Sequence, residues 1–231
     1  MLKINGLNQY YGQSHTLRDL DLEVNAGECM CLMGRNGVGK TTLLNTLMGQ
    51  LKAKSGTMLF ADKEISSCSV EERASLGIGY VPQGRQIFPL LSVEENLRIG
   101  LPARRDRLKQ VPAFIYELFP VLAEMKQRRG GDLSGGQQQQ LAIGRALVLD
   151  PDLLILDEPT EGIQPNIVAE IGDIIRKLNK ETGLTVLLVE QKLPFARKVG
   201  DRFCLLDRGK NVATGSMSEL GEDLIRTYLT V

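Results

Sequence analysis

The sequence predicts an α/β fold built around a mostly parallel sheet. Uninterrupted apolar runs at residues 78–81 and 153–156 are typical of parallel strands that are buried on both faces. A third apolar run, residues 28–33, leads into a glycine-rich loop, and residues 40–51 then carry leucines at helical spacing. The 231 residues are enough for one such domain, with room for a subdomain.

Residues 1–27 are expected to form strands and turns, because apolar and polar residues alternate there. Beyond the helix at 40–51 we expect a strand at 56–60 and a short helix at 71–75, before the strand at 78–81. Strand signals then give way to helical periodicity from residue 84 to residue 150. We therefore predict a helical subdomain at 84–150, inserted into a core of residues 1–83 and 151–231.

The second half of the core also follows from the sequence. A helix is expected to begin at Gln164 and Pro165, because proline is tolerated in the first helical turn. A strand at 185–189 and a short helix should follow, and a strand–turn–strand around Gly209 should come last.

Composition excludes several classes of protein. Twenty-eight basic residues balance 28 acidic ones, so no overall field favours nucleic acid or anionic lipid. No uncharged apolar run approaches the ~18 residues needed to span a bilayer, and the N-terminus does not read as a signal peptide. We therefore expect a soluble protein that stays where it is made.

The four cysteines, at positions 29, 31, 68 and 204, lack metal-ligand spacing and are expected to be buried, reduced thiols of a cytosolic protein. Cys29 and Cys31 are expected to face opposite sides of the sheet. The single histidine, His15, excludes a His-cluster metal site and a Ser-His-Asp triad elsewhere in the chain, and it is expected to lie in a surface turn.

Residues 34–41 match the phosphate-binding pattern G-x-x-x-x-G-K-[ST]. Glycines that can adopt positive φ let backbone N–H groups wrap around phosphates, and the next helix points its positive end at them. Lys40 would bind the β- and γ-phosphates, and the Thr41 hydroxyl would bind Mg²⁺. A chance glycine-rich turn is the competing interpretation, but the strand before the loop and the helix after it argue against that. The predicted nucleotide-binding residues are Gly34, Arg35, Asn36, Gly37, Val38, Gly39, Lys40, Thr41 and Thr42.

Two carboxylates, Asp157 and Glu158, end the apolar run at 153–156. Ligands of parallel sheets collect at the carboxyl ends of the strands. Asp157 could hold Mg²⁺ there, directly or through water, and Glu158 could orient or deprotonate an attacking water. A strand followed by a polar turn would explain the pair if it stood alone. The phosphate-binding loop makes the catalytic interpretation the better one.

Ser134, Gly135 and Gly136 precede Gln137 and a long helical pattern. As an N-cap, Ser134 would satisfy free N–H groups at the start of that helix. The same helix start also offers backbone N–H groups and a positive dipole end to a phosphate. The sequence therefore contains two candidate anion sites, at residues 34–42 and 134–137.

This ordered set of motifs resembles the nucleotide-binding domain of ABC transporters, and the resemblance covers essentially the whole chain. Residues 34–41 look like Walker A, 153–158 like Walker B with its catalytic glutamate, and 133–137 like the LSGGQ signature. Many NTPases share Walker A alone, whereas LSGGQ in this position is specific to the family. The resemblance implies a P-loop NTPase (RecA-like) core with an antiparallel β subdomain and an inserted helical subdomain, of the ABC ATPase type.

The resemblance also implies that ATP and Mg²⁺ are the cofactors. The working unit would be a head-to-tail dimer with a second nucleotide-binding domain, either another copy or a sister ATPase. In that dimer Ser134, Gly135, Gly136 and Gln137 would contact the γ-phosphate held by the partner's Walker A motif. Gln83 looks like the Q-loop glutamine, which would sense Mg²⁺ and the γ-phosphate. Tyr11 looks like the aromatic residue that stacks on adenine, although core packing is the default role of a tyrosine.

Family membership further implies partners and a location. The helical subdomain and the Q-loop would form a groove for a coupling helix of transmembrane permease subunits. An extracytoplasmic solute-binding protein would act indirectly, and no nucleic acid is implied. The chain would lie peripherally on the cytoplasmic face of the bacterial inner membrane.

Two positions depart from the common family pattern. Gln164 stands where the D-loop usually has a carboxylate, and Gln191 stands at the position of the switch histidine. An amide can donate and accept hydrogen bonds, so Gln191 could still reach the γ-phosphate, but it cannot carry a proton. Glu158 remains the predicted base, with Gln191 as the second predicted catalytic residue.

The solute is inferred from resemblance alone. Residues 82–89, 161–165 and 189–191 look like those of importer ATPases for branched-chain amino acids and urea. Residues 129–133 and 160–165 look most similar to those of urea transporter subunits. Urea import is therefore the prediction, with branched-chain amino acid import as the alternative. A remote alternative is an ABC-type ATPase that acts on nucleic acid or the ribosome, but such proteins usually carry paired domains, coiled coils or basic extensions, which are not seen in this sequence. A P-loop kinase is a third alternative, and the LSGGQ motif argues against it because a kinase has no use for that motif.

Overall fold

A six-stranded sheet forms the centre of the computed structural model, which describes residues 1–230. The strand order is β10-β9-β3-β8-β7-β6; all but β10 run parallel, and β10 pairs with β9 in the antiparallel sense. Strands β3, β7 and β8 are buried along their whole length, which explains their continuous apolar sequences. The bounds are β3 (Cys29–Met33), β6 (Ile78–Val81), β7 (Leu153–Asp157), β8 (Thr185–Val189), β9 (Arg202–Asp207) and β10 (Lys210–Ser216).

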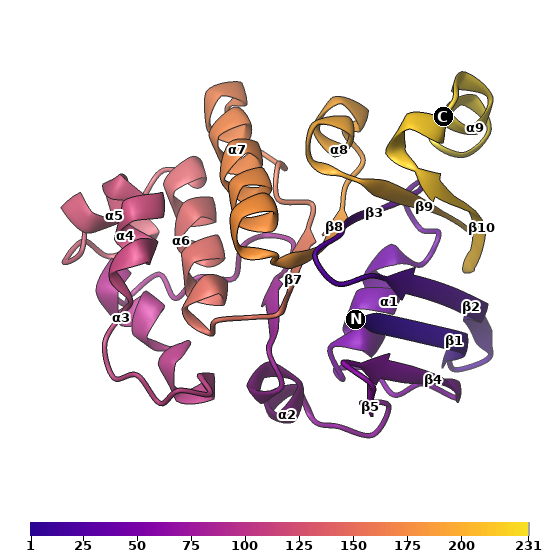
Figure 1. Cartoon of the computed structure of the whole chain (residues 1–231), viewed down its shortest axis with the longest axis horizontal. Coiled ribbons are helices and arrows are strands. Elements are labelled where there is room, and N and C mark those ends of the chain that lie inside the picture. Colours follow the sequence, from indigo (N-terminus) through magenta and orange to yellow (C-terminus); the bar gives the residue numbers. More distant parts are fainter. Residues whose placement is uncertain (231) are drawn as a thin grey trace.

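A second sheet is antiparallel, with the order β2-β1-β4-β5. Its strands are β1 (Leu2–Tyr11), β2 (Ser14–Val24), β4 (Ser55–Phe60) and β5 (Lys63–Glu64). This sheet lies at the lower right of Figure 1, next to helix α1 (Lys40–Leu47). The predicted antiparallel part of the fold is therefore confirmed.

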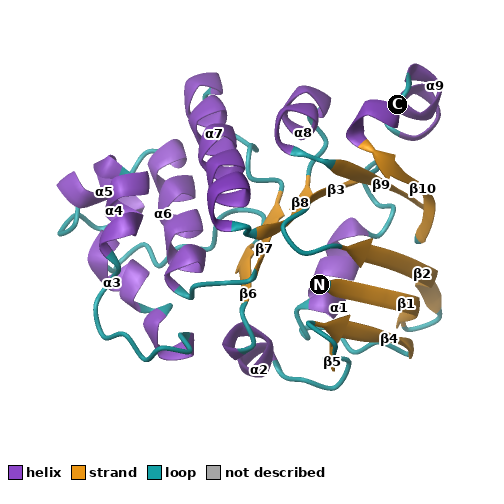
Figure 2. Ribbon diagram, in the orientation of Figure 1, coloured by secondary structure: helices purple, strands orange, loops and turns teal. Residues whose placement is uncertain are grey.

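Helices occupy the segment for which strand signals vanish. Within residues 84–150 the chain forms α3 (Val93–Arg98), α4 (Ala113–Leu118), α5 (Pro120–Glu124) and α6 (Gly135–Val148), together with short 3₁₀ turns at Leu101–Ala103 and Gly130–Asp132. Figure 2 shows these helices gathered on the side away from the antiparallel sheet. Helix α6 shares a hydrophobic core with Leu154 and Leu156 of β7, so packing does not separate the helical segment from the rest of the chain. The subdomain bounds at residues 84 and 151 therefore stay a prediction.

The remaining helices are α2 (Val70–Ser75), α7 (Pro165–Thr182), α8 (Leu193–Val199) and α9 (Glu222–Tyr228), with a 3₁₀ turn at Met217–Glu219. Pro165 is the first residue of α7, as expected, and Gln164 is its N-cap residue. Among residues 1–230, none of the helices combines the length and apolar character that crossing a bilayer requires.

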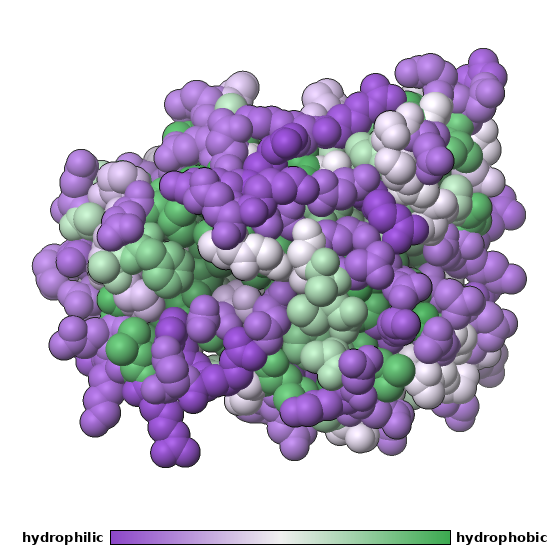
Figure 3. All heavy atoms as spheres, viewed as in Figure 1, coloured by the Kyte–Doolittle hydropathy of each residue, from purple (hydrophilic) through white to green (hydrophobic). Residues whose placement is uncertain are grey.

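Two hydrophobic cores cover the two faces of the six-stranded sheet. One core joins alternate residues of the sheet to α1 and to the antiparallel strands. The other core joins the opposite face to α6, α7 and α8 (Figure 1). On the face shown in Figure 3, hydrophilic side chains predominate and hydrophobic ones form separate patches. Both sides of the sheet are thus buried, which leaves the ends of its strands as the place for a site.

Four local expectations were wrong. Cys68 is half-buried, whereas the other three cysteines are buried as expected. Cys29 and Cys31 belong to the same core, because side chains two residues apart point to the same face of a strand. Helix α1 ends at Leu47 rather than near residue 51, since Gly49 follows with a φ of +78°. His15 lies within β2, half-buried, with its ring stacked on Tyr10 at 4.1 Å between centroids.

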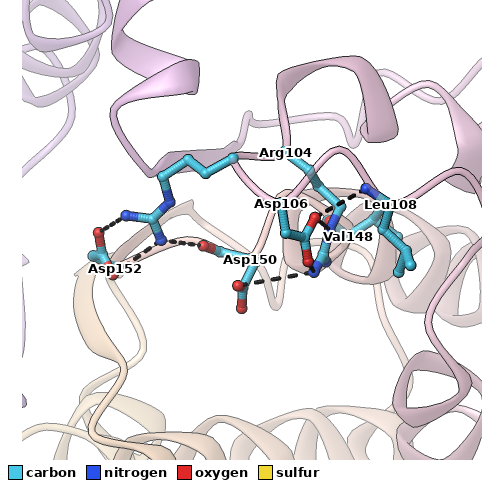
Figure 4. Close-up of polar contacts among 7 residues, drawn as sticks. Arg104, Asp106, Leu108, Val148, Asp150 and Asp152 are labelled. Carbon is cyan, nitrogen blue, oxygen red and sulfur yellow. Dashed lines mark hydrogen bonds and ion pairs between the residues drawn. The ribbon is translucent and has the colours of Figure 1, made fainter.

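An ion-pair network fixes the connector that follows α3 to the turn between α6 and β7 (Figure 4). Arg104 donates to Asp106 at 2.8 Å and to the carbonyl of Val148 at 2.8 Å. Arg105 pairs with Asp152 at 2.5 Å. The charged stretch interpreted from sequence as a solvated connector is therefore anchored by its arginines to the end of α6 and the turn before β7.

Candidate nucleotide site

The loop after β3 adopts a conformation that depends on glycine. Gly34, Gly37 and Gly39 have φ values of +154°, +80° and +112°, a region that L side chains rarely adopt. A Cβ on Gly34 would also lie 2.4 Å from the carbonyl oxygen of Leu206. The loop is thus shaped by backbone freedom, and it leads directly into the N-terminus of α1, as anion binding requires.

Lys40 is the first residue of α1, and its side chain reaches back into this loop. Its side chain is 6% exposed, and Nζ donates to the carbonyls of Gly34 at 2.7 Å and Arg35 at 2.9 Å. Burial lowers the pKa of Lys40, while the charges of Glu158 and Asp157 act in the opposite direction. The ammonium is therefore held by the loop and faces the carboxylates at the end of β7.

Asp157 is the last residue of β7 and is 3% exposed. Burial, together with the neighbouring charge of Glu158, raises its pKa from 3.8 to about 6. Glu158 follows with a φ of +47°, which is uncommon for a residue other than glycine, and its backbone N–H donates to Val189 in β8 at 2.9 Å. The turn thus directs two successive carboxylates toward the end of the sheet.

Two glutamine side chains converge on Glu158. The Gln83 amide, after β6, donates to Glu158 Oε2 at 3.3 Å and to Glu161 Oε2 at 3.0 Å. The Gln191 amide, after β8, donates to Glu158 Oε1 and, at 2.8 Å, to Asn36 Oδ1 in the glycine-rich loop. The ends of three neighbouring strands and the phosphate loop therefore meet at one carboxylate.

Two adjoining cavities open around this carboxylate, and Asn36, Gln83 and Glu158 border both. The first is otherwise lined by Thr16, Gly37, Gly39, Lys40, Thr41 and Thr42. The second is otherwise lined by Thr160, Glu161, Glu190, Gln191 and Lys192. The site therefore combines an anion-binding loop with a carboxylate that amides orient from both sides.

Comparison with known proteins agrees with this geometry. A protein-family model described as ABC transporter matches residues 17–161. The chain belongs to the ABC transporter family. BraG of Pseudomonas aeruginosa, a high-affinity branched-chain amino acid transport ATP-binding protein, is 42% identical over 213 residues, which cover 92% of this chain and 91% of BraG.

Further relatives share both sequence and fold. LivF of Archaeoglobus fulgidus, a probable branched-chain amino acid transport ATP-binding protein, is 37% identical over 96% of this chain and 94% of LivF. The solved dimeric, post-hydrolysis structure of the ATP-binding cassette MJ0796, bound to ADP and Pi, has a TM-score of 0.82 at 25% identity and covers 94% of this chain and 99% of that chain. The fold is thus that of an ABC ATPase cassette, and the chain is an ATP-binding, ATP-hydrolysing protein.

The predicted magnesium ligands fit a small, hard cation. Thr41 and Gln83 border the first cavity, whereas Asp157, a buried carboxylate at the end of β7, lines neither cavity. This is an all-oxygen donor set, since the amide of Gln83 also offers a carbonyl. A cation here would also favour ionisation of Asp157, whose raised pKa reflects burial and a neighbouring negative charge.

The signature residues lie apart from the phosphate loop. Ser134 is the N-cap of α6, where it accepts from the N–H of Gln137 at 3.4 Å while the Gln137 side chain accepts from the N–H of Ser134 at 2.9 Å. Gly135 and Gly136 form the first turn of α6. None of these four residues lines either cavity. The N-cap interpretation of Ser134 is therefore confirmed, and the signature residues lie outside the two cavities around Glu158.

Tyr11 ends β1 and is 49% exposed, so its ring is available for stacking. It does not line the cavity beside the Walker A loop; Thr16 of β2 does. Sequence reasoning also missed Thr160, Glu190 and Lys192 as site residues, although Thr160 and Glu190 lie in segments that resemble the importer subfamily. Only their nearness to Glu158 and Gln191 along the chain could have drawn attention to them.

Proposed function

We propose that this chain is the ATPase subunit of an importer, and that ATP hydrolysis by it drives uptake of branched-chain amino acids through membrane permease subunits. The hydrolytic part of the proposal is supported by Glu158, which two amides orient at the strand ends beside the Walker A loop. The solute is supported by BraG and LivF, which are both named for branched-chain amino acid transport.

Each residue has a task in this proposal. The loop at residues 34–42 binds the phosphates of ATP, and Lys40 is the cation that stabilises charge on the γ-phosphate. Thr41, Asp157 and Gln83 hold Mg²⁺, which when bound supplies positive charge to the phosphate oxygens. Glu158 accepts the proton of the attacking water at a carboxylate oxygen.

A second copy or a sister ATPase completes the site. The α6 N-terminus, with Ser134, Gly135 and Gly136, would meet the γ-phosphate bound by the partner's Walker A loop. Tyr11 would stack on the adenine. The chain would lie against the cytoplasmic side of a membrane through its permease subunits, and an extracytoplasmic solute-binding protein would deliver the solute.

Glu158→Gln tests the hydrolytic role. We expect ATP binding to be retained and turnover to fall by roughly 100-fold or more, because the amide cannot accept the proton. A matched control is Glu170→Gln, an exposed carboxylate of α7, which should leave turnover unchanged. Equal turnover in wild type and Glu158→Gln would refute the role of Glu158.

The solute is tested in the complex assembled with its permease subunits and solute-binding protein. We expect leucine to stimulate ATP hydrolysis and urea to have no effect. Urea is the second candidate, and it rests only on the resemblance of residues 129–133 and 160–165 to urea transporter subunits. Stimulation by urea alone would replace branched-chain amino acids with urea and would leave the ATPase role intact.

A further inference from the structure

A buried carboxylate to which the sequence motifs assign no role lies next to the site. Glu190 follows β8 directly and is 2% exposed. Its Oε1 accepts from the backbone N–H groups of Gln191 at 2.8 Å and Lys192 at 2.9 Å, and its Oε2 accepts from the hydroxyl of Thr160 at 2.7 Å. Burying a carboxylate is costly unless it is hydrogen-bonded, and three donors meet that requirement here.

These bonds join two loops that are far apart in sequence. Thr160 lies two residues after Glu158 in the loop that follows β7, whereas Gln191 and Lys192 lie in the loop that follows β8. Lys192 adds a second link, since its Nζ donates to the carbonyl of Thr160 at 2.9 Å. Because β7 and β8 are neighbours in the sheet, Glu190 can hold both loops at once.

The link bears directly on the orientation of Glu158. Gln191 is exposed, and an exposed glutamine gains rotamer entropy when it is released from its partners. Its amide nevertheless donates to both Glu158 and Asn36. The backbone turn from which this side chain starts is fixed by Glu190 Oε1.

We propose that Glu190 is a positioning residue for hydrolysis, which holds the turn of Gln191 so that the Gln191 amide stays on Glu158. The proposal rests on the proposed role of Glu158 as the base. Glu190 acts through hydrogen-bond geometry, so an isosteric amide should replace it. The carbonyl of a glutamine could accept from both backbone N–H groups, and its NH₂ could donate to the Thr160 hydroxyl.

The kinetic test compares Glu190→Ala with Glu190→Gln in the full chain. We expect Glu190→Ala to lower kcat by about tenfold or more with KM for ATP within about twofold, because small misplacements of catalytic groups are costly and the phosphate loop is untouched. Glu190→Gln should stay within about threefold of wild type. The matched control is Thr185→Ala at the other end of β8, where a buried hydroxyl accepts from the N–H of Gly27 at 3.0 Å. That variant should lose stability without losing kcat at temperatures where it is folded.

A double-mutant cycle shows whether Glu190 acts through Gln191. The variant with both Glu190→Ala and Gln191→Ala should turn over no more slowly than Gln191→Ala alone. The proposal would be overturned if the kcat losses of Glu190→Ala and Gln191→Ala multiplied in the double variant. A Gln191→Ala variant with normal kcat, or a Glu190→Gln variant as slow as Glu190→Ala, would overturn it as well.

A readout that does not depend on hydrolysis separates this proposal from the proposed function. The side-chain amide of Gln191, assigned in ¹⁵N NMR spectra by its loss in Gln191→Ala, should shift in Glu190→Ala toward the position of a free glutamine. It should stay in place in Thr185→Ala and Glu190→Gln. An unshifted amide in Glu190→Ala would refute the positioning role, whereas normal turnover in Glu158→Gln would refute the base and leave this result standing.

Discussion

Replacing Asp157 by asparagine should stabilise the metal-free protein. The pKa of Asp157 is about 6 in the folded chain against an ordinary 3.8, because burial and Glu158 disfavour its charge. Folding therefore favours the protonated carboxyl. The contribution of this group to the free energy of unfolding is largest below about pH 4 and is lost as the pH rises through about 6. At about 1.4 kcal/mol per pH unit, the loss amounts to about 3 kcal/mol, of which about 2 kcal/mol falls between pH 4.5 and 7.5.

The measurement is urea unfolding of wild type and Asp157→Asn, with EDTA, at steps of pH from 4.5 to 7.5. The difference in unfolding free energy should increase in favour of Asp157→Asn by about 2 kcal/mol across this range and level off above pH 7. Asp106→Asn is the control: Arg104 holds the pKa of Asp106 well below its usual range, so that carboxyl is ionised throughout and the corresponding difference should be nearly flat. A flat or falling difference for Asp157→Asn would refute the reasoning.

Two further substitutions test the scaffold that carries the site. Arg73→Met should destabilise the fold by roughly 2–4 kcal/mol in urea unfolding, because the buried guanidinium donates to the main-chain carbonyls of Thr46 and Leu47 at the end of α1. Arg73→Lys should recover part of the loss, and an unchanged midpoint for Arg73→Met would contradict this account. Gly209→Ala should lower the free energy of unfolding by more than about 2 kcal/mol, since its Cβ would lie 2.0 Å from the Thr16 carbonyl oxygen. Gly12→Ala has open space around it and should cost only about 1–2 kcal/mol for its positive φ. Equal losses of stability in the two variants would count against the steric explanation.

The parts of the fold that the sequence predicts well are those in which local pattern and burial coincide. Strands β7 and β8 are apolar along their length because both faces of the sheet are covered, so no polar residue interrupts the signal. The cap at Ser134 and the helix start at Pro165 are equally local, since each depends on one residue and the next few along the chain.

The contacts that orient Glu158 could not be predicted in the same way. Gln83 and Gln191 lie 75 and 33 residues away from it in sequence, and only the strand order of the folded sheet brings them together. The role of Glu190 has no local signal either, because its partner Thr160 comes from the loop that follows the neighbouring strand β7. The sequence motifs therefore predict which groups perform the chemistry, and the sheet topology determines which groups hold them.

The hydrogen bonds of Glu158 also connect it to the helical part of the chain. The segment after Gln83 is fastened to α6, since Arg145 donates to the carbonyl of Gln86 at 2.9 Å. Arg85 donates in turn to the carbonyl of Glu161 at 3.3 Å, in the loop that carries Glu158.

In the chain alone, each oxygen of Glu158 accepts one amide hydrogen bond and keeps a further acceptor site for a water, so the two amides set the direction of the carboxylate without blocking it. Gln83 is the more easily moved of the two amides, because its bond is the longer one and the segment after it is held by α6. We therefore expect any partner that displaces the helices to act on hydrolysis by moving Gln83, while Gln191 stays fixed to the sheet. Gln83→Ala should then weaken the dependence of hydrolysis on that partner more than Gln191→Ala does, which can be measured as the ratio of turnover with and without permease subunits.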